Sequence, residues 1–333
     1  MATRRRFITI AAGCAALPML AHAGVEPVVW RGSAMGALAS MTLLHPDRAK
    51  ARALLAACVD EVARLEAVFS LYRADSALAR LNAAGELRDP PHELVELLAF
   101  ALALARESGG AFDPTVQPLY RLYAEHFAHA GAAPGGPPAQ AIERVRRTVD
   151  FRGVEVGADR IRLHRTGMAL TLNGVAQGYV TDRVADRLRA AGFSDVLIDL
   201  GEARAAGVGP GGRAWRAAVA DPRRPSQALF ELPLGDGGDA LPALATSTGY
   251  GTRFGPDARV HHLFDPHTGR SANPWLSVTV AAERATLADG LSTAIAVSPP
   301  GRAAALLGAH PSTHAWLVDA AAQVHEPGTV HAA

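Results

Sequence analysis

The stretch Met168-Ala-Leu-Thr-Leu-Asn-Gly-Val-Ala-Gln-Gly-Tyr-Val-Thr-Asp182 carries the clearest structural signal in the chain. Residues 168–172 alternate in character and predict a strand, which Asn173-Gly174 ends. A helix follows, because apolar residues recur with a period of about 3.6 residues at Val175, Tyr179, Val180, Val184 and Leu188. We expect Asn173 to cap this helix, and Gly174 and Gly178 to let its backbone approach a ligand.

The start of such a helix suits a phosphate, because it presents free N–H groups and the positive end of the helix dipole. An ordinary strand-to-helix turn has the same sequence pattern, so this stretch alone leaves both interpretations open.

Length and composition narrow the class of protein. The chain has 333 residues, of which 49% are hydrophobic, and this is enough to bury a large core. The net charge is +1 and no basic stripe is present, which argues against a nucleic-acid binder.

Residues 1–23 predict a twin-arginine (Tat-type) signal peptide. Thr3-Arg-Arg-Arg-Phe-Ile8 provides the charged region, an apolar run continues to Leu20, and Ala21-His-Ala23 forms a cleavage site. The apolar run is too short to span a bilayer. We therefore expect the Tat export machinery to deliver a mature chain, residues 24–333, to the periplasm.

The two cysteines support a cleaved signal. Ala11-Ala-Gly-Cys14 lacks the leucine usual three residues before a lipoprotein cysteine, so cleavage after Ala23 is favoured over lipidation at Cys14. The mature chain then keeps only Cys58, which excludes an intramolecular disulfide. Apolar neighbours at helical spacing make Cys58 a core residue.

Helices gather early in the chain and strands mostly late. Helical patterns cover 47–69, 76–82, 91–108, a segment after Pro114, the segment from 175 to 188, 286–297 and 301–307. Strand patterns occur at 28–44, three times between 148 and 172, and at 195–220, 228–234, 241–247, 260–265, 275–282 and 315–318. This order favours an α+β fold over regular βαβ alternation.

Two motifs point away from common enzyme classes. Gly207-Val-Gly-Pro-Gly-Gly212 matches a dinucleotide fingerprint in letters, but Pro210 and the strand-like residues after it predict a hairpin turn. His261, His262 and His267 fit no zinc spacing, and the chain contains no phosphate-binding P-loop and no hydrolase nucleophile elbow. Of these histidines we take His262 as the candidate pocket residue.

Asp289 and Thr293 are the best candidate metal ligands. At i and i+4 on a helix they share a face, and their oxygens would suit Mg²⁺ together with a backbone carbonyl and substrate phosphates. The alternative is an Asp at a helix start, with Thr293 bonded back to the carbonyl four residues earlier. Ala111-Phe-Asp-Pro-Thr115 is likewise compatible with a simple Asx turn.

Taken in order, these motifs resemble the ApbE family of FAD:protein FMN transferases over nearly the whole mature chain. The motifs are Met35-Gly36, Phe69-Ser-Leu-Tyr72, Ser76-x-Leu78-x-x-Leu81-Asn82, Gly110-Ala-Phe-Asp-Pro-Thr115, Gly174-Val-Ala-Gln-Gly-Tyr-Val-Thr-Asp182, Trp215 before Asp221-Pro222, Ala245-Thr-Ser247, His262-x-x-Asp265-Pro266-x-Thr268-Gly269 and Asp289-x-x-Ser-Thr293. The resemblance implies an α+β fold related to the T-fold, a single large domain with mixed or antiparallel sheets and flanking helices. It also implies Mg²⁺-dependent cleavage of FAD, transfer of FMN to a threonine of an acceptor protein, and release of AMP.

The resemblance assigns roles to residues of this chain. Gly174, through its carbonyl, would hold the metal with Asp289 and Thr293. His262 is the candidate general base by residue type alone, because the pKa of an unperturbed histidine allows base work near neutral pH. Positions implied to contact FAD are Met35, Tyr72, Ala111, Phe112, Asp113, Thr171, Gln177 and Leu263.

The chain departs from the family pattern Asp-x-Gly-x-x-Ala-Lys-Gly at Thr171, Asn173 and Gln177, and Glu202 replaces a second glycine after Gly201. Losing the acid and the lysine together is consistent with an ion pair exchanged for a neutral hydrogen bond, with weaker FAD binding, or with a changed acceptor. The alternatives are therefore a flavin-binding protein or FAD pyrophosphatase that no longer transfers FMN, and a periplasmic binding module. An exported member also resembles accessory proteins of nitrous oxide reductase, whose acceptor is a membrane-anchored electron-transfer protein with a periplasmic domain.

Overall fold

A computed structural model describes residues 25–235, 237 and 240–327. The signal peptide expected at residues 1–23 lies outside this part of the chain. Within it, no helix combines the length and the apolar character needed to cross a bilayer.

An eight-stranded sheet forms the centre of the structure, with strand order β1-β2-β6-β7-β10-β13-β14-β15 and antiparallel pairing between all neighbours. The strands are β1 (Val28–Ala34), β2 (Ala37–Leu44), β6 (Asp195–Asp199), β7 (Ala203–Ala206), β10 (Ala243–Thr248), β13 (Ser277–Ala282), β14 (Thr313–Val318) and β15 (Val324–His325). This sheet and the helices beside it confirm the α+β fold expected from the sequence.

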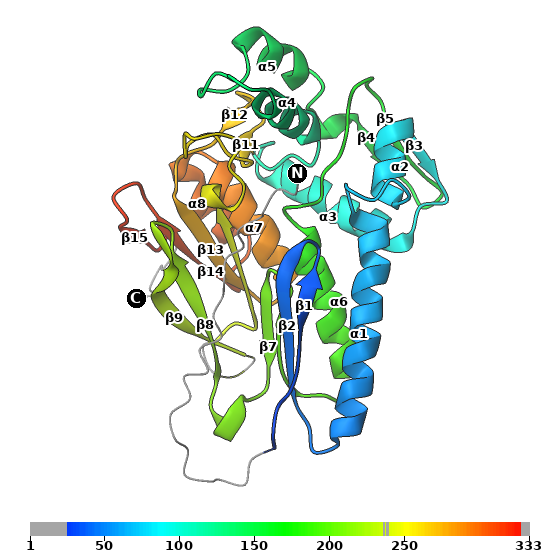
Figure 1. The fold of residues 1–333 in the computed structure, drawn as a ribbon, viewed down its shortest axis with the longest axis vertical. Coiled ribbons are helices and arrows are strands. Elements are labelled where there is room, and N and C mark those ends of the chain that lie inside the picture. Colours follow the sequence, from blue (N-terminus) through cyan, green and yellow to red (C-terminus); the bar gives the residue numbers. More distant parts are fainter. Residues whose placement is uncertain (1–24, 236, 238–239, 328–333) are drawn as a thin grey trace.

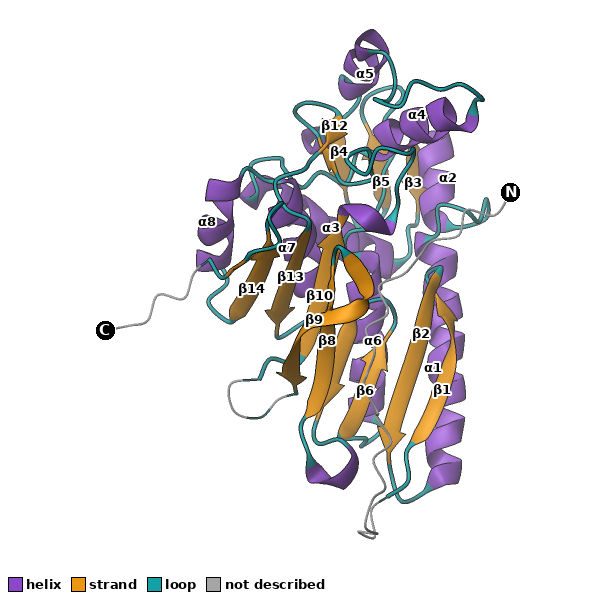
Figure 2. Cartoon of the chain, turned by 60° about the vertical axis from the view of Figure 1, so that its left-hand side comes forward, coloured by secondary structure: helices purple, strands orange, loops and turns teal. Residues whose placement is uncertain are grey.

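Three helices pack together on one face of the sheet (Figures 1 and 2). These are α1 (Arg48–Phe69), α6 (Ala176–Ala190) and α7 (Ala285–Val297). Asp47 begins α1 as its N-cap, since its side chain accepts a 2.9 Å hydrogen bond from Lys50 N–H. Cys58 is fully buried on the inner face of α1, as its helical neighbours predict.

The opposite face of the sheet is covered by a long β-ribbon, β8 (Trp215–Asp221) with β9 (Arg224–Leu234). A three-stranded sheet consists of β3 (Glu86–Arg88), β4 (Val154–Val156) and β5 (Arg160–Leu163). A separate hairpin consists of β11 (Phe264–Asp265) and β12 (Arg270–Ser271). The remaining helices are α2 (Ala77–Ala84), α3 (His92–Glu107), α4 (Gln117–Ala128), α5 (Ala139–Arg146) and α8 (Ala303–Gly308).

The strand expected at 168–172 is wrong. These residues are mostly buried but form no strand, and the backbone of Leu170 pairs with a side chain instead of a neighbouring strand. Leu170 N–H donates to Asn82 Oδ1 at 2.6 Å, and Asn82 Nδ2 donates back to the Leu170 carbonyl at 2.8 Å. Thr171 N–H donates to the Pro114 carbonyl. The segment is therefore held between α2 and the loop before α4.

Other local expectations also need correction. Helix α6 begins after Val175, with no side-chain cap, so Asn173 does not have the capping role expected of it. The glycine-rich stretch 207–212 connects β7 to β8, which belong to different sheets, so it is not a hairpin turn. The strand expected over 260–265 is limited to Phe264–Asp265.

Candidate functional site

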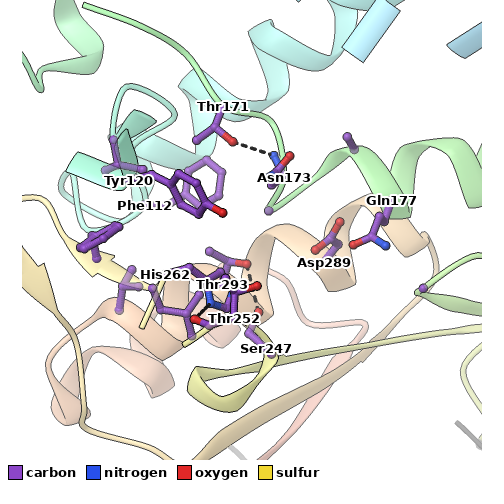
Figure 3. Close-up of a pocket in the computed structure, with 18 of the residues that line it drawn as sticks. Phe112, Tyr120, Thr171, Asn173, Gln177, Ser247, Thr252, His262, Asp289 and Thr293 are labelled. Carbon is purple, nitrogen blue, oxygen red and sulfur yellow. Dashed lines mark hydrogen bonds between the residues drawn. The ribbon is translucent and has the colours of Figure 1, made fainter. Parts of the chain in front are cut away.

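An open pocket forms where the β1–β2 turn, the starts of α4 and α6, the β6–β7 turn, the end of β10 and α7 meet (Figure 3). Most of the residues singled out in the sequence line it: Met35, Ala111, Phe112, Asp113, Thr171, Gly174, Gln177, His262, Leu263, Asp289 and Thr293. Tyr72 is not among the described residues that line it, and 70% of this residue is exposed. The Phe69-Ser-Leu-Tyr72 motif at the end of α1 therefore does not bring Tyr72 into the pocket.

Met35 reaches the pocket from a strained turn. Met35 and Gly36, at φ 50° and 77°, form the two-residue connection of the β1–β2 hairpin, where both residues need positive φ. Met35 N–H donates to the Glu66 carboxylate of α1, which holds the turn in place. A non-glycine residue in this conformation costs free energy, and such strain concentrates at functional sites.

Asp113 organises the loop before α4. Its Oδ1 accepts from Thr115 N–H at 2.7 Å and from Thr115 Oγ1 at 2.6 Å, and its Oδ2 accepts from Phe151 N–H at 3.1 Å. Burial raises the pKa of Asp113, and these hydrogen bonds oppose the shift. The Asx turn expected at this motif is present, and it places Phe112 in the pocket wall.

Helices α6 and α7 touch at Gly178. A Cβ at Gly178 would lie 2.3 Å from the Ala285 carbonyl oxygen, so only glycine allows this approach. Gly178 N–H donates to Asp289 Oδ2 at 3.0 Å, across the two helices. Burial raises the pKa of Asp289 to about 7, although the Gly178 N–H lowers it, and the charge of Asp182 raises it further.

A cluster of hydroxyl groups lies beside Asp289. Ser247 Oγ is 3.0 Å from Thr293 Oγ1 (Figure 3). It is also 2.8 Å from Ser292 Oγ. It is Ser292 that bonds back to the Asp289 carbonyl, at 2.9 Å. A Cβ at Gly174 would meet Thr293 Oγ1 at 3.1 Å, so the Gly174 backbone passes close to that hydroxyl.

Glu202 is a pocket residue to which sequence reasoning gave no role. It lies between β6 and β7, lines the pocket and is 7% exposed. Burial raises its pKa well above the usual range, Asp289 and Asp199 add to the shift, and a backbone hydrogen bond from Thr246 opposes it. The sequence does show an acid at 202 where the family pattern has a glycine. It does not show that this side chain is buried in the pocket wall.

Gln177 packs against the same turn. Gly201 has φ 106°, and a Cβ there would lie 2.2 Å from Gln177 Nε2, so the amide rests on the bare backbone before Glu202. Figure 3 shows Gln177 and Asp289 side by side. Thr171 has a different neighbour, since its Oγ1 accepts from Asn173 N–H at 3.2 Å.

The three histidines have separate environments. His262 lines the pocket, and its Nδ1 is 3.3 Å from the Thr252 carbonyl oxygen. His261 is buried, its Nε2 lies 3.2 Å from Asn273 Oδ1, and burial lowers its pKa to about 4. His267 is exposed and bonds to Asp265.

Comparison with known proteins identifies the family of this chain. A sequence model of the ApbE family matches residues 35–317. The chain belongs to the ApbE family. Among curated relatives, the FAD:protein FMN transferase of Klebsiella pneumoniae is 28% identical, over 87% of this chain and 84% of its own length. That of Treponema pallidum is 32% identical, over 76% and 73% respectively.

Solved structures of ApbE proteins share the fold. The protein from Thermotoga maritima superposes with a TM-score of 0.75 at 26% identity, covering 90% of this chain and 97% of its own. The flavin transferase ApbE from Vibrio cholerae gives a TM-score of 0.76 over 90% and 96%, and at 24% identity it supports the fold alone.

Proposed function

We propose that the chain is an FAD:protein FMN transferase, which cleaves FAD, attaches FMN to a threonine of an acceptor protein and releases AMP. One observation carries the proposal most directly. A buried acid and a hydroxyl on α7, Asp289 and Thr293, face the backbone that opens α6, and all of them border one open pocket. The transferase relatives, which match most of the chain, supply the reaction.

The oxygen-rich pocket fits a hard divalent cation such as Mg²⁺. Asp289, Thr293 and the Gly174 carbonyl offer three kinds of oxygen donor, and the Asp289 carboxylate has one backbone N–H as its hydrogen-bond donor. No cluster of three acids, histidines or cysteines able to hold a metal occurs in the described residues, so this site would rely on hydroxyl and carbonyl oxygens too. When bound, the cation would neutralise pyrophosphate charge and stabilise the departing AMP.

The protein itself would orient the substrate. Apolar side chains of Met35, Phe112 and Leu263 form walls suited to a flavin ring. The Gly178 N–H is used by Asp289, so phosphate binding falls to the earlier residues of the α6 start. Positioning of this kind matters most in phosphoryl-type transfer, where the protein does little covalent chemistry.

His262 is the proposed general base. Its Nδ1 lies 3.3 Å from the Thr252 carbonyl oxygen, which places the ring at the pocket wall. The imidazole would take the proton of the acceptor threonine. Replacing His262 with Asn should lower transfer and leave FAD binding unchanged, which an equilibrium titration of flavin fluorescence would test.

We further propose that the acceptor is a membrane-anchored electron-transfer protein with a periplasmic domain. The support is the twin-arginine sequence at residues 3–8 and the cleavage site ending at Ala23.

A single assay separates transferase from the alternatives. The mature chain is incubated with FAD and Mg²⁺, with and without an acceptor domain, and AMP is quantified. AMP that depends on the acceptor supports transfer. AMP without acceptor indicates a pyrophosphatase, and no AMP in either case indicates a binding protein, and both results contradict the proposal.

A further inference from the structure

Glu202 is buried without a full set of partners. It follows Gly201 at the turn from β6 into β7, lines the pocket and is 7% exposed. Its Oε2 has no hydrogen-bond partner among the described residues. Buried carboxylates are ordinarily paired, hydrogen-bonded or bound to a metal, so an orphaned oxygen at a pocket wall indicates a missing ligand.

The acids around Glu202 are not balanced by bases. Asp289 and Asp199 are the charged groups that act on it, and both are acidic. Arg204, two residues along the chain, is occupied by an ion pair with Asp182. Within the described part of the chain, no ion pair connects a basic side chain to Glu202, Asp289 or Asp199. Ionisation of these acids therefore needs a positive charge that the described side chains do not supply.

We propose that Glu202 adds a second carboxylate to the divalent-cation site of Asp289, so that this chain binds Mg²⁺ before FAD arrives. A site with one carboxylate depends on substrate phosphates to complete Mg²⁺ coordination, and a second carboxylate raises affinity through charge. The inference rests on the cation site of the proposed function, but not on FMN transfer. Gln177, which is neutral beside Gly201, leaves the site free of a competing ammonium group.

The direct test measures cation binding without FAD. Mg²⁺ is titrated calorimetrically into the mature chain, and Mn²⁺ binding is followed by electron paramagnetic resonance. Glu202→Gln should weaken both by at least tenfold. Glu231→Gln is the matched control, because Glu231 is an exposed residue of β9 paired with Arg216, and it should change neither affinity. Affinities for Glu202→Gln within twofold of the parent, or no binding by the parent chain, would overturn the inference.

Thermal unfolding provides a second readout that is independent of activity. In chelator, Glu202→Gln should melt no lower than the parent, because the amide keeps the shape of a buried acid that has no basic partner among the described residues. Added Mg²⁺ should stabilise the parent more than the variant. If Glu202→Gln does not fold, Glu202→Gly replaces it in the titrations with the same expected loss. An equal Mg²⁺ stabilisation of parent and variant contradicts the proposal.

Flavin transfer by the parent chain is measured separately. Cation binding that depends on Glu202, without transfer to any acceptor, would refute the proposed function and support this inference. If the parent transfers FMN and Glu202→Gln binds the cation as the parent does, the proposed function is supported and this inference is refuted.

Discussion

At the scale of single residues, two buried acids on the facing helices α6 and α7 have different roles. Asp182 accepts hydrogen bonds from Ala285 N–H, Thr286 N–H and Thr286 Oγ1, and it pairs with Arg204 and Arg284. Asp182 thus caps α7 from α6 and is fully compensated. Among the described residues, only the Gly178 N–H donates a hydrogen bond to the Asp289 side chain. The under-compensated acid is the one available to a ligand.

Replacing Asp289 with Ala should reduce FMN transfer by about a hundredfold or more and leave the fold intact. The acid contributes no ion pair to the described structure, so its loss removes a proposed cation ligand and little packing. Transfer is measured by flavin fluorescence of the acceptor in a gel, and folding by circular dichroism. Asp182→Ala, which removes the cap of α7, should instead lower stability. Undiminished turnover of Asp289→Ala at limiting Mg²⁺ would contradict the metal assignment.

The raised pKa of Asp289 predicts a pH dependence of stability. A folded-state pKa of about 7 lies above the ordinary 3.8, so the folded state holds more protons between these values, and its stability falls as pH rises from about 4 to 7. His261 acts oppositely, since its pKa of about 4 is lowered from 6.5 and its contribution grows as pH rises. Comparing urea unfolding of the cation-free parent with Asp289→Asn isolates the first effect. Identical pH slopes in the two proteins would show that Asp289 titrates normally.

Gln177→Lys should weaken Mg²⁺ binding by roughly tenfold, because a charged hydrogen-bond donor would be introduced at the turn that carries Glu202. Sequence reasoning paired position 177 with Thr171, but in the structure these residues contact Gly201 and Asn173 respectively. Adding Thr171→Asp should therefore not restore affinity. A double-mutant cycle on the Mg²⁺ dissociation constant checks this, and coupling well above about 0.5 kcal/mol would show that the two positions act as a pair.

At the scale of elements, the crossing of α6 and α7 sets the geometry of the site. Gly178→Ala should destabilise the protein by about 1–3 kcal/mol, as overpacking in a tight contact does. The displaced backbone would also withdraw its N–H from Asp289, so transfer should fall. Gly308→Ala is the matched control, because a Cβ there meets nothing within 4 Å. Equal unfolding midpoints for the two variants in urea would rule out a tight crossing.

Local signals explain which elements were predictable from sequence. Helices α1 and α2 begin at side-chain caps, Asp47 and Ser76, and these are readable from neighbouring residues. The segment 168–172 was misread because its hydrogen-bond partner, Asn82, is distant in sequence. Residue types and their spacing also made Asp289 and Thr293 candidates for the site, and both line the pocket. The unpartnered Oε2 of Glu202 could not be predicted, because it depends on which residues pack around it in the folded chain.

At the scale of the whole molecule, the pocket draws on segments from Met35 to Val297. The central sheet makes this possible, because β2 lies beside β6 and β7 lies beside β10, although the members of each pair are distant in sequence. Their turns and ends line one pocket together with residues of α6 and α7, and these two helices pack on one face of the sheet (Figure 2). Several of the short motifs behind the family resemblance belong to these segments, among them Met35-Gly36, Gly110-Ala-Phe-Asp-Pro-Thr115 and Asp289-x-x-Ser-Thr293.

Export to the periplasm is the remaining prediction, and it depends on residues 1–23, which lie outside the described part of the chain. Arg4→Lys combined with Arg5→Lys should leave the uncleaved chain in the cytoplasm, because the twin arginine is the signal read for export. The unaltered protein should be recovered from the periplasm with Gly24 as its first residue, as N-terminal sequencing would show. A chain beginning at a lipid-modified Cys14 would instead place the protein on a membrane. Periplasmic recovery of both proteins in equal amounts would mean that export does not require the arginine pair.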